Sequence, residues 1–375
     1  MRVRLTKDIL DPFLCVTSKS NIFHTEVTDL KQGEVNILIT GAGAPGAAGI
    51  LKCLRMEPSF HVTAADANSQ ASGKYLAERF ETIPAGTDPA FAATVLSLCQ
   101  EKNIHVILPL VTRELLPLAV HTYEFSAAGI KIPVSPAASL EIANNKSRLY
   151  EFLQWRGIAV PEFRVVENAD QFREAARELG YPGKTICFKP SVSNGSRGFR
   201  IISDQVDELD LLFNFKPGST YIHFREADRI LSSGAFPELL ISEYLPGEEY
   251  SVDCLARRGE AILVAPRIRR RMINGISVEG EFIKEGSIIE YCTQIIKELQ
   301  LHGNIGIQVK RSATGQFLVL EINPRVQGSI AAGLGAGINL PVLALKQELG
   351  LPISPAELQV KWGTKFSRFW EEVFY

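Results

Sequence analysis

Apolar and polar positions alternate in blocks over the first third of the chain, after residue 34. The apolar run NILIT predicts a buried strand, AAGILKCLRM predicts a helix, and HVTAAD, which starts at His61, predicts a second strand. The helical pattern ATVLSLCQEKN and the apolar run HVILPL, which starts at His105, continue the alternation toward Pro133. A strand, a helix and a strand in this order form a βαβ unit, so we expect a small parallel sheet flanked by helices and the α/β fold class.

A second pattern of helices and strands starts at Ser139. SLEIANNKSRLYEFLQWRG predicts two short helices that stop at Gly157, and AVPEFRVV predicts the strand that follows. The amphipathic segment ADQFREAARELG predicts a helix with Phe172 and Leu179 on its apolar side. KTICFKP and LLISEYLPGEEYSVDCLAR predict further strands, the second segment divided by a hinge-like Pro-Gly pair. The change of pattern predicts a second lobe, and no segment of the first is repeated in it.

The segment GIQVKRSATGQFLVLEINPRVQGS, Gly306 to Ser329, predicts a hairpin with a polar face. Two apolar runs flank a polar turn at residues 312–315, so we expect Gln308 beside Glu321 on neighbouring strands. The alternative interpretation is a solvated hairpin with a polar rim.

The second predicted strand of this hairpin carries further polar residues at a spacing of two. Glu321, Asn323 and, if the strand continues past Pro324, Arg325 then share one face with Gln308. Carboxylate and amide oxygens suit Mg²⁺, which keeps several waters and bridges to nucleotide phosphates. An arginine beside them can hold a transferring phosphoryl group or an acyl phosphate.

The glycine turn GAGAPG follows a predicted strand and opens a predicted helix. Gly41, Gly43 and Gly46 match the dinucleotide fingerprint, and Asp66 follows about twenty residues later at a strand end. An NAD site, close packing of a helix, and an anion of the substrate are three interpretations of this turn.

Two lysines and a second glycine-containing turn are candidates for phosphate binding. Lys189 follows the apolar run ICF, so its ammonium is expected to be partly enclosed and to need an anion. The turn SVSNGSRG at residues 191–198 brings backbone amides and the Ser196 hydroxyl near, with an ordinary hairpin turn as the alternative. Lys146 starts a helix, where a surface lysine is also common.

The segment SEYLPGEEY predicts a strand end, a hinge and a new strand. Glu243 ends the first strand, Tyr244 and Leu245 begin the hinge, and Glu249 begins the next strand. A hinge backbone can bind an adenine edge and an acidic side chain can accept both ribose hydroxyls, whereas a plain polar turn is the alternative. The cluster at Arg267, Arg269, Arg270 and Arg271 is either a solvated loop or an anion-binding lid.

Composition and charge exclude several classes of protein. The 375 residues carry 40 basic and 42 acidic side chains, so no overall field favours nucleic acid or an anionic membrane as partner. The six cysteines form no CxxC pair and the six histidines show no HExxH spacing, which argues against a disulfide framework and a zinc site. The first residues lack a secretion signal, so we expect a cytoplasmic protein.

Taken in order, these motifs resemble the ATP-grasp superfamily and its usual N-terminal partner domain. They are Lys146, Lys189, SNGSRG, EYLPGEEYSVD, the Ile-Gln strand and EINPR. The resemblance extends from about Val35 to Gly350, and it is nearest to one synthetase half of the carbamoyl phosphate synthetase large subunit and to stand-alone carboxylate-amine ligases. Many relatives carry an acidic residue where Gln308 stands, whereas the carbamoyl phosphate synthetases resemble this chain.

This resemblance implies a fold and its boundaries. A Rossmann-like parallel-sheet domain at 34–134 is expected to precede a two-lobed ATP-grasp domain at 135–350, with a lid lobe at about 159–245 and a catalytic lobe at about 246–350. Residues 1–33 are then an N-terminal extension and residues 351–375 a C-terminal tail.

The resemblance also implies roles for individual residues. The residues that bind ATP are Lys146, Lys189, Ser196, Glu243, Tyr244, Leu245 and Glu249, of which Glu249 holds the ribose and the backbone of Tyr244 and Leu245 the adenine. Those that hold one or two Mg²⁺ or Mn²⁺ ions are Gln308, Glu321 and Asn323. The catalytic residues are Arg325, Arg267 and Lys189, and Gly43, Gly46 and Asp66 form the substrate side of the cleft.

The expected function is that of an ATP-dependent ligase. A substrate carboxylate forms an acyl phosphate with release of ADP, and an amine then displaces phosphate to give an amide or peptide-like bond. The alternatives are carbamoyl phosphate synthetase-like phosphorylation of a small carboxylate or carbamate, an ATP-binding protein without turnover, and an NAD-dependent oxidoreductase. The partners are small carboxylates and amines. The sequence leaves the oligomeric state open, with a homodimer as the commonest assembly on general grounds.

Overall fold

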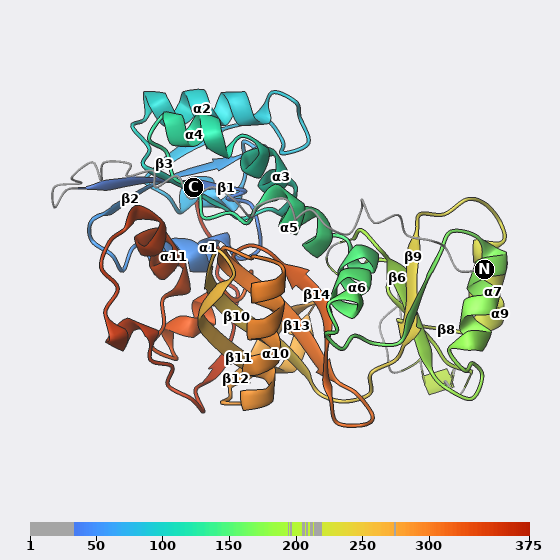
Figure 1. Ribbon diagram of the computed structural model, residues 1–375. Coiled ribbons are helices and arrows are strands. Elements are labelled where there is room, and N and C mark those ends of the chain that lie inside the picture. The colour runs from blue at the N-terminus through green and yellow to red at the C-terminus, as the bar shows by residue number, and fades with distance from the viewer. Residues whose placement is uncertain are drawn as a thin grey trace, which may run out of the picture.

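The computed structural model describes residues 34–375, except residues 194, 196, 205, 206, 208, 211, 212, 214–219 and 274. The predicted N-terminal extension and Ser196 therefore lie outside the described residues. Helices and strands alternate through the chain and form three sheets, so the predicted α/β fold class is confirmed (Figure 1). Within the described residues no helix is both long and apolar enough to cross a membrane.

The first sheet is parallel and has the strand order β3-β2-β1-β4. Its strands are β1 (Val35–Thr40), β2 (Phe60–Asp66), β3 (Arg79–Thr82) and β4 (Val106–Pro109). Its helical segments are α1 (Ala47–Leu54), η1 (Ser72–Tyr75), α2 (Phe91–Glu101), α3 (Thr112–Val120) and α4 (Thr122–Ala127). The chain enters this sheet by β1, α1 and β2, so the predicted βαβ unit is confirmed.

Both faces of the first sheet are buried, because the side chains of β1 alternate between two cores. Ile37 and Ile39 pack with α1, whereas Leu38 packs on the other side with α2. A strand of a parallel sheet that is covered on both faces has a continuous run of apolar residues, as in the segment NILIT of β1.

The second sheet has five strands in the order β5-β9-β6-β7-β8. The strands are β5 (Phe163–Val166), β6 (Ile186–Pro190), β7 (Arg200–Ile202), β8 (Tyr221–Ile222) and β9 (Leu239–Glu243). Helices α7 (Ala169–Glu178) and α9 (Phe224–Leu231) lie side by side against this sheet (Figure 1). Helices α5 (Ala137–Ala143) and α6 (Lys146–Trp155) come between the first sheet and this one in the chain.

The third sheet is antiparallel and has the strand order β14-β13-β10-β11-β12-β15. The strands are β10 (Glu249–Arg257), β11 (Glu260–Ile273), β12 (Ile276–Phe282), β13 (Gly303–Arg311), β14 (Phe317–Asn323) and β15 (Lys365–Ser367). The helical segments are α10 (Gly286–Glu298), η2 (Ile330–Leu334), α11 (Leu340–Leu349) and η3 (Pro355–Leu358).

The two faces of the third sheet have different neighbours. Val252 and Cys254 of β10 pack into a core with α6 and α10, whereas Leu255 packs with α11 and the first sheet. Because side chains alternate along a strand, Ser251 and Asp253 share the face of Leu255. Polar side chains of this sheet are therefore turned toward the first sheet, and this face carries the candidate site.

The hairpin β13–β14 has the register that the sequence predicted, with Gln308 opposite Glu321. The strand does not continue past Pro324, because β14 ends at Asn323 and a proline has no N–H to donate to a ladder. Arg325 therefore lies in a loop, where its backbone N–H donates to the Asn323 carbonyl at 2.7 Å. The condition under which Arg325 would share the strand of Glu321 and Asn323 is therefore not met.

Candidate functional site

One cleft of about 940 Å³ collects side chains from all three sheets. The first sheet contributes the glycine turn at residues 44–46, and the second contributes Lys189 and the hinge at residues 243–245. The third contributes the polar face of β10, β11, β13 and β14 and the loop at residues 325–329. Most of the predicted site residues therefore meet in one place, although they are spread over nearly 300 positions of the sequence.

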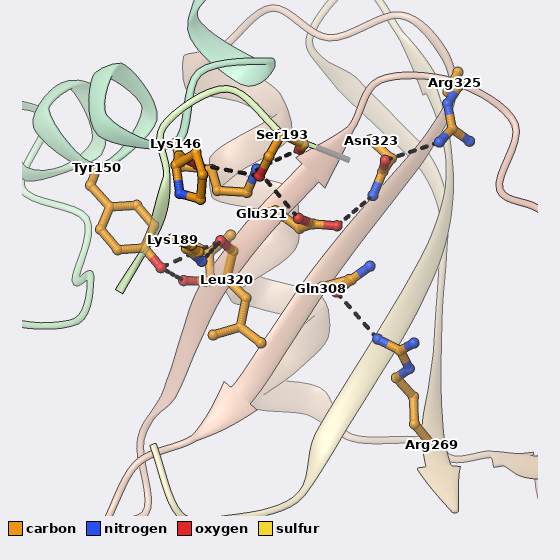
Figure 2. A network of polar contacts seen from close by, with 12 residues as sticks. Lys146, Tyr150, Lys189, Ser193, Arg269, Gln308, Leu320, Glu321, Asn323 and Arg325 are labelled. Carbon is orange, nitrogen blue, oxygen red and sulfur yellow. Dashed lines mark hydrogen bonds and ion pairs between the residues drawn. The ribbon is translucent and has the colours of Figure 1, made fainter. Parts of the chain in front are cut away.

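The buried Lys146 and the partly buried Lys189 reach the same strand of the cleft (Figure 2). Lys146 begins α6, because Asn145 caps that helix by accepting from the Arg148 N–H at 3.1 Å. The Lys146 Nζ donates to the Ser193 carbonyl at 2.8 Å and lies 3.7 Å from Glu321 Oε2. The Lys189 Nζ donates to the Leu320 carbonyl at 2.8 Å.

The surroundings of these lysines favour an anionic ligand. Burial lowers the pKa of both the Lys146 and the Lys189 ammonium, and the nearby Glu321 carboxylate opposes the shift. Each ammonium can donate three hydrogen bonds, and backbone carbonyls take up only part of this capacity. Two partly desolvated cations side by side are therefore ready to bind phosphate oxygens.

Three oxygen-bearing side chains lie on adjacent strands of the cleft floor. Figure 2 shows Gln308, Glu321 and Asn323 on the same side of the β13–β14 hairpin. The Asn323 Nδ2 donates to Glu321 Oε1 at 3.2 Å, so these two side chains are already in contact. No group of three or more His, Cys, Asp or Glu side chains suited to a metal occurs among the described residues.

This donor set fits a magnesium ion that is shared with phosphates. Mg²⁺ in nucleotide sites is held by one or two carboxylates, substrate phosphates and water, and not by a cage of protein ligands. One carboxylate with two amide oxygens meets that requirement for one ion. A second ion would have no carboxylate of its own here.

Arg325 is held at the junction of the third and first sheets. Its Nε donates to Thr112 Oγ1 at 3.0 Å, its Nη1 to the Val326 carbonyl at 2.8 Å and its Nη2 to Asn323 Oδ1 at 3.2 Å. These three acceptors are uncharged, and burial lowers the pKa of the guanidinium. The guanidinium of Arg325 is thus fixed beside the side-chain oxygens of the predicted metal ligands. Its positive charge is not neutralised by the three groups that hold it, because they are uncharged.

Arg267 does not line the cleft, contrary to the catalytic position that was predicted for it. Its side chain is fully buried, and its Nε donates to Asp253 Oδ2 at 2.6 Å. Its Nη2 donates to Ser329 Oγ at 2.6 Å, and Ser329 lines the cleft. Arg267 thus supports the wall of the cleft from behind, because its guanidinium is turned onto a buried carboxylate.

Arg269, two residues later, is the arginine of the basic cluster that lines the cleft. Its Nη1 donates to Glu249 and, at 3.2 Å, to Gln308 Oε1, and its Nε donates to Ser277 Oγ at 3.0 Å. The guanidinium therefore joins the predicted ribose residue, Glu249, to a predicted metal ligand, Gln308, and Figure 2 shows the contact with Gln308.

Sequence reasoning named Arg269 only as part of a cluster, and a β-bulge explains why. Counting back from the turn at residues 258–259 would place Glu249 opposite Ile268. A register shift between Leu255 and Ala256 moves the pairing by one residue, so that Tyr250 lies opposite Ile268 and Glu249 comes beside Arg269. A bulge of this kind has no signal in the sequence.

The predicted hinge lies at the mouth of the cleft. Glu243 ends β9, and its carboxylate accepts from the Glu162 N–H at 2.9 Å. The Tyr244 N–H donates to the Thr185 carbonyl at 3.2 Å, and the Lys310 ammonium lies 4.5 Å from the Tyr244 ring centre. Leu245 is buried and also lines the cleft.

The glycine turn of the first sheet is closed upon itself. The Gly43 N–H donates to Asp66 Oδ2 at 2.7 Å, and the Ala44 N–H donates to the Gly41 carbonyl at 2.9 Å. A Cβ atom on Gly46 would lie 2.5 Å from the Gly328 Cα, so only glycine permits this approach. Of the three interpretations of the turn, the geometry fits close packing of the helix. The Gly43 N–H already donates to Asp66, so it is not free to bind a dinucleotide phosphate.

Two family models match separate parts of the chain. "ATP-grasp in the biosynthetic pathway with Ter operon" matches residues 235–368, and "PylC-like, N-terminal domain" matches residues 37–133. The N-terminal section of the carbamoyl phosphate synthase large chain of Methanopyrus kandleri is 24% identical over 304 residues, which cover 74% of this chain and 49% of that protein. The chain spans half or less of the length of the curated relatives it matches first.

Solved structures with the same fold include two from bacteria. An L-amino acid ligase from Bacillus licheniformis has a TM-score of 0.60 at 17% identity, covering 87% of this chain and 76% of that one. The biotin carboxylase domain of a 2-oxoglutarate carboxylase from Hydrogenobacter thermophilus, crystallised as a dimer with MgADP and bicarbonate, has a TM-score of 0.60 at 16% identity, covering 87% of this chain and 72% of that one.

Proposed function

Because the chain belongs to the ATP-grasp superfamily, we propose that it is an ATP-dependent ligase that joins a carboxylate to an amine. One observation carries this proposal above the others. The ammonium groups of Lys146 and Lys189 lie against β14, Lys146 at 3.7 Å from Glu321 and Lys189 on the carbonyl of Leu320. Two largely enclosed cations beside a carboxylate suit a triphosphate with its metal, and they do not suit a nicotinamide ring.

The nucleotide is proposed to lie between the second and third sheets. Its phosphates meet Lys146 and Lys189, its adenine edge meets the backbone of Tyr244 and Leu245, and its ribose hydroxyls meet Glu249. Glu249 already has a charged partner in Arg269, so the ribose must share this carboxylate or displace the guanidinium. The carboxylate proposed to bind the ribose is therefore not free, because it is already paired with Arg269.

The proposed metal ligands are Gln308, Glu321 and Asn323. A Mg²⁺ or Mn²⁺ ion held there would neutralise charge on the phosphates during transfer. Arg325 is proposed to orient the acyl phosphate, because its guanidinium is fixed beside these oxygens by Thr112 and Asn323.

The proposed reaction has two steps. In the first, a carboxylate oxygen of the substrate attacks the γ-phosphorus, the bond from that phosphorus to the ADP oxygen breaks, and ADP leaves. In the second, an amine nitrogen attacks the acyl carbon, inorganic phosphate leaves with the electron pair of the broken bond, and the amine loses a proton. Side chains act by orienting and by neutralising charge, as phosphoryl transfer requires.

We also propose the domain boundaries given by the sequence, 34–134 and 135–350, and a homodimer as the assembly. The dimer rests on general frequency and on the dimeric state of the Hydrogenobacter thermophilus domain. Limited proteolysis tests the domain boundaries, and a mass measurement in solution tests the dimer.

The test is a screen of amino acids and small carboxylates, with pooled amines and ammonia, for release of ADP that depends on the acid. A carboxylate labelled with ¹⁸O distinguishes the mechanism, because passage through an acyl phosphate transfers one labelled oxygen to the released phosphate. Glu321→Gln is expected to abolish ADP release, whereas Glu260→Gln, at the exposed tip of the β10–β11 hairpin, serves as the matched control. Unlabelled phosphate, or ADP release that persists in folded Glu321→Gln protein, would refute the proposal.

A further inference from the structure

The part of the cleft formed by the first sheet differs in character from the nucleotide end. Among the described residues, the side chains that the first sheet and its helices contribute to the cleft are all uncharged, namely Ala44, Pro45, Gly46, Ile50 and Leu110. Val326 faces them from the loop after β14. Ile50, Leu110 and Val326 are each no more than 3% exposed, so this wall is packed and apolar. We call these six residues the apolar wall.

The backbone of the apolar wall offers little to an anion. The N–H groups of Gly43, Ala44 and Ala47 donate to Asp66, to the Gly41 carbonyl and to the Ala44 carbonyl, respectively. Gly46 is covered by Gly328, whose Cα a Cβ at position 46 would approach to 2.5 Å. Three N–H groups of the turn are therefore engaged within the first sheet and are not free to hold a phosphate.

Two arginines near the apolar wall have other roles. Arg267 lies behind Ser329 and is neutralised by Asp253. Arg325 is the guanidinium proposed to hold the reacting acyl phosphate. A second carboxylate or a phosphate on the substrate would thus lie at the apolar wall without a cation of its own, which is unfavourable.

Resting on the proposed ligase function, we propose that the apolar wall binds the side group of the acid substrate, and that this group is apolar and without a second acid or a phosphate. The substrate class is then a monocarboxylate with an aliphatic or similar apolar group. The reacting carboxylate points toward Arg325 and the metal ligands, and the apolar group points toward Ile50, Leu110 and Val326.

The first experiment compares acids that differ only in the group in question. Pentanoate, glutarate and 4-phosphonobutyrate form one set, and leucine, glutamate and O-phosphoserine form another, each with saturating MgATP and the same amine pool. The wild-type protein is expected to show a kcat/KM for ADP release at least tenfold higher with the apolar member of a set. A preference for the dicarboxylate or the phosphorylated member would overturn the inference and leave the ligase function standing.

A charge placed on the wall gives the second measurement. Pro45→Lys adds a cation at an exposed position of the cleft rim, and Ala48→Lys adds the same charge on the exposed side of α1 outside the cleft. Pro45→Lys is expected to lower the ratio of kcat/KM for the apolar acid to kcat/KM for the acidic members of its set by about tenfold. Ala48→Lys is expected to leave this ratio unchanged. Equal preferences in both variants would contradict the placement of the side group, and absence of ADP release with every acid would refute the ligase function itself.

Discussion

Arg267→Met tests whether the buried arginine behind the cleft supports the fold or takes part in the reaction. The guanidinium and the Asp253 carboxylate have no exposed surface, and they are joined by a 2.6 Å hydrogen bond. Methionine fills a similar volume without charge. The substitution leaves Asp253 buried with one remaining side-chain donor, Gln327 Nε2 at 2.8 Å, and it leaves Ser329 Oγ without its 2.6 Å donor.

The expected cost follows from the unpaired carboxylate. Removing one partner of a buried ion pair lowers the free energy of unfolding by about 3 to 5 kcal/mol. For a cooperative unit of about 200 residues, each kcal/mol shifts the midpoint of thermal unfolding by roughly 2 to 4 °C, so we expect a fall of roughly 6 to 20 °C. The double variant Arg267→Met/Asp253→Leu removes both charges and is expected to recover most of this loss, because apolar replacement of a whole buried pair is often neutral.

Thermal and urea unfolding followed by circular dichroism measure the effect, with ADP release measured on the same samples below the transition. Arg271→Met is the matched control on the same strand, since its side chain is 51% exposed and its ion pair with Glu279 is expected to contribute no more than about 1 kcal/mol. An Arg267→Met protein that unfolds with the wild type and yet loses ADP release would show that our structural assignment is wrong and that the guanidinium acts on a ligand.

Three further predictions concern titrating or competing groups. Burial lowers the pKa of Lys189, so its charge costs the folded state stability below that lowered pKa, and the free energy of unfolding rises as the pH increases from the lowered pKa to the usual lysine value. Lys189→Met is therefore expected to match or exceed the wild type in urea stability at pH 7 while losing ADP release, and a marked loss of stability would contradict this account. Burial raises the pKa of Glu114 to about 7, so its stabilising effect is present below about pH 4.5 and is lost as pH rises through 7, by about 3 kcal/mol at most. Glu114→Gln should therefore be more stable than the wild type at pH 8, and equal stability of the two at that pH would count against the raised pKa. Arg269→Gln frees Glu249 from its guanidinium, so calorimetry is expected to show equal or tighter binding of adenosine, and a tenfold weaker binding would instead assign Arg269 to the ribose.

Local patterns predicted those parts of the site whose geometry depends on neighbouring residues. The polar turn at 312–315 separates two apolar runs, and this is enough to place Gln308 opposite Glu321 on β13 and β14. The apolar run before Lys189 likewise indicates an enclosed ammonium, which the structure confirms. In both cases the prediction depends only on the alternation of side chains along a strand, which has a period of two residues.

Two features of the site could not be predicted from the sequence, because they depend on residues that are distant along the chain. The bulge between Leu255 and Ala256 shifts the pairing of β10 and β11 by one residue, so that Glu249 comes beside Arg269 and not opposite Ile268. Pro324 ends β14, so the direction of Arg325 depends on Thr112 of the first sheet, 213 positions earlier. Neither outcome follows from periodicity or propensity.

The sequence by itself determined the α/β order of elements, the polar hairpin and the types of side chain available for phosphates and a metal. Only the tertiary structure decided that the glycine turn packs closely against Gly328 at Gly46. It also decided that one arginine of the basic cluster lines the cleft and another is neutralised behind it. The physical reason is that charge and burial depend on what comes to lie opposite a residue, and such partners are brought together from distant parts of the chain by the packing of sheets.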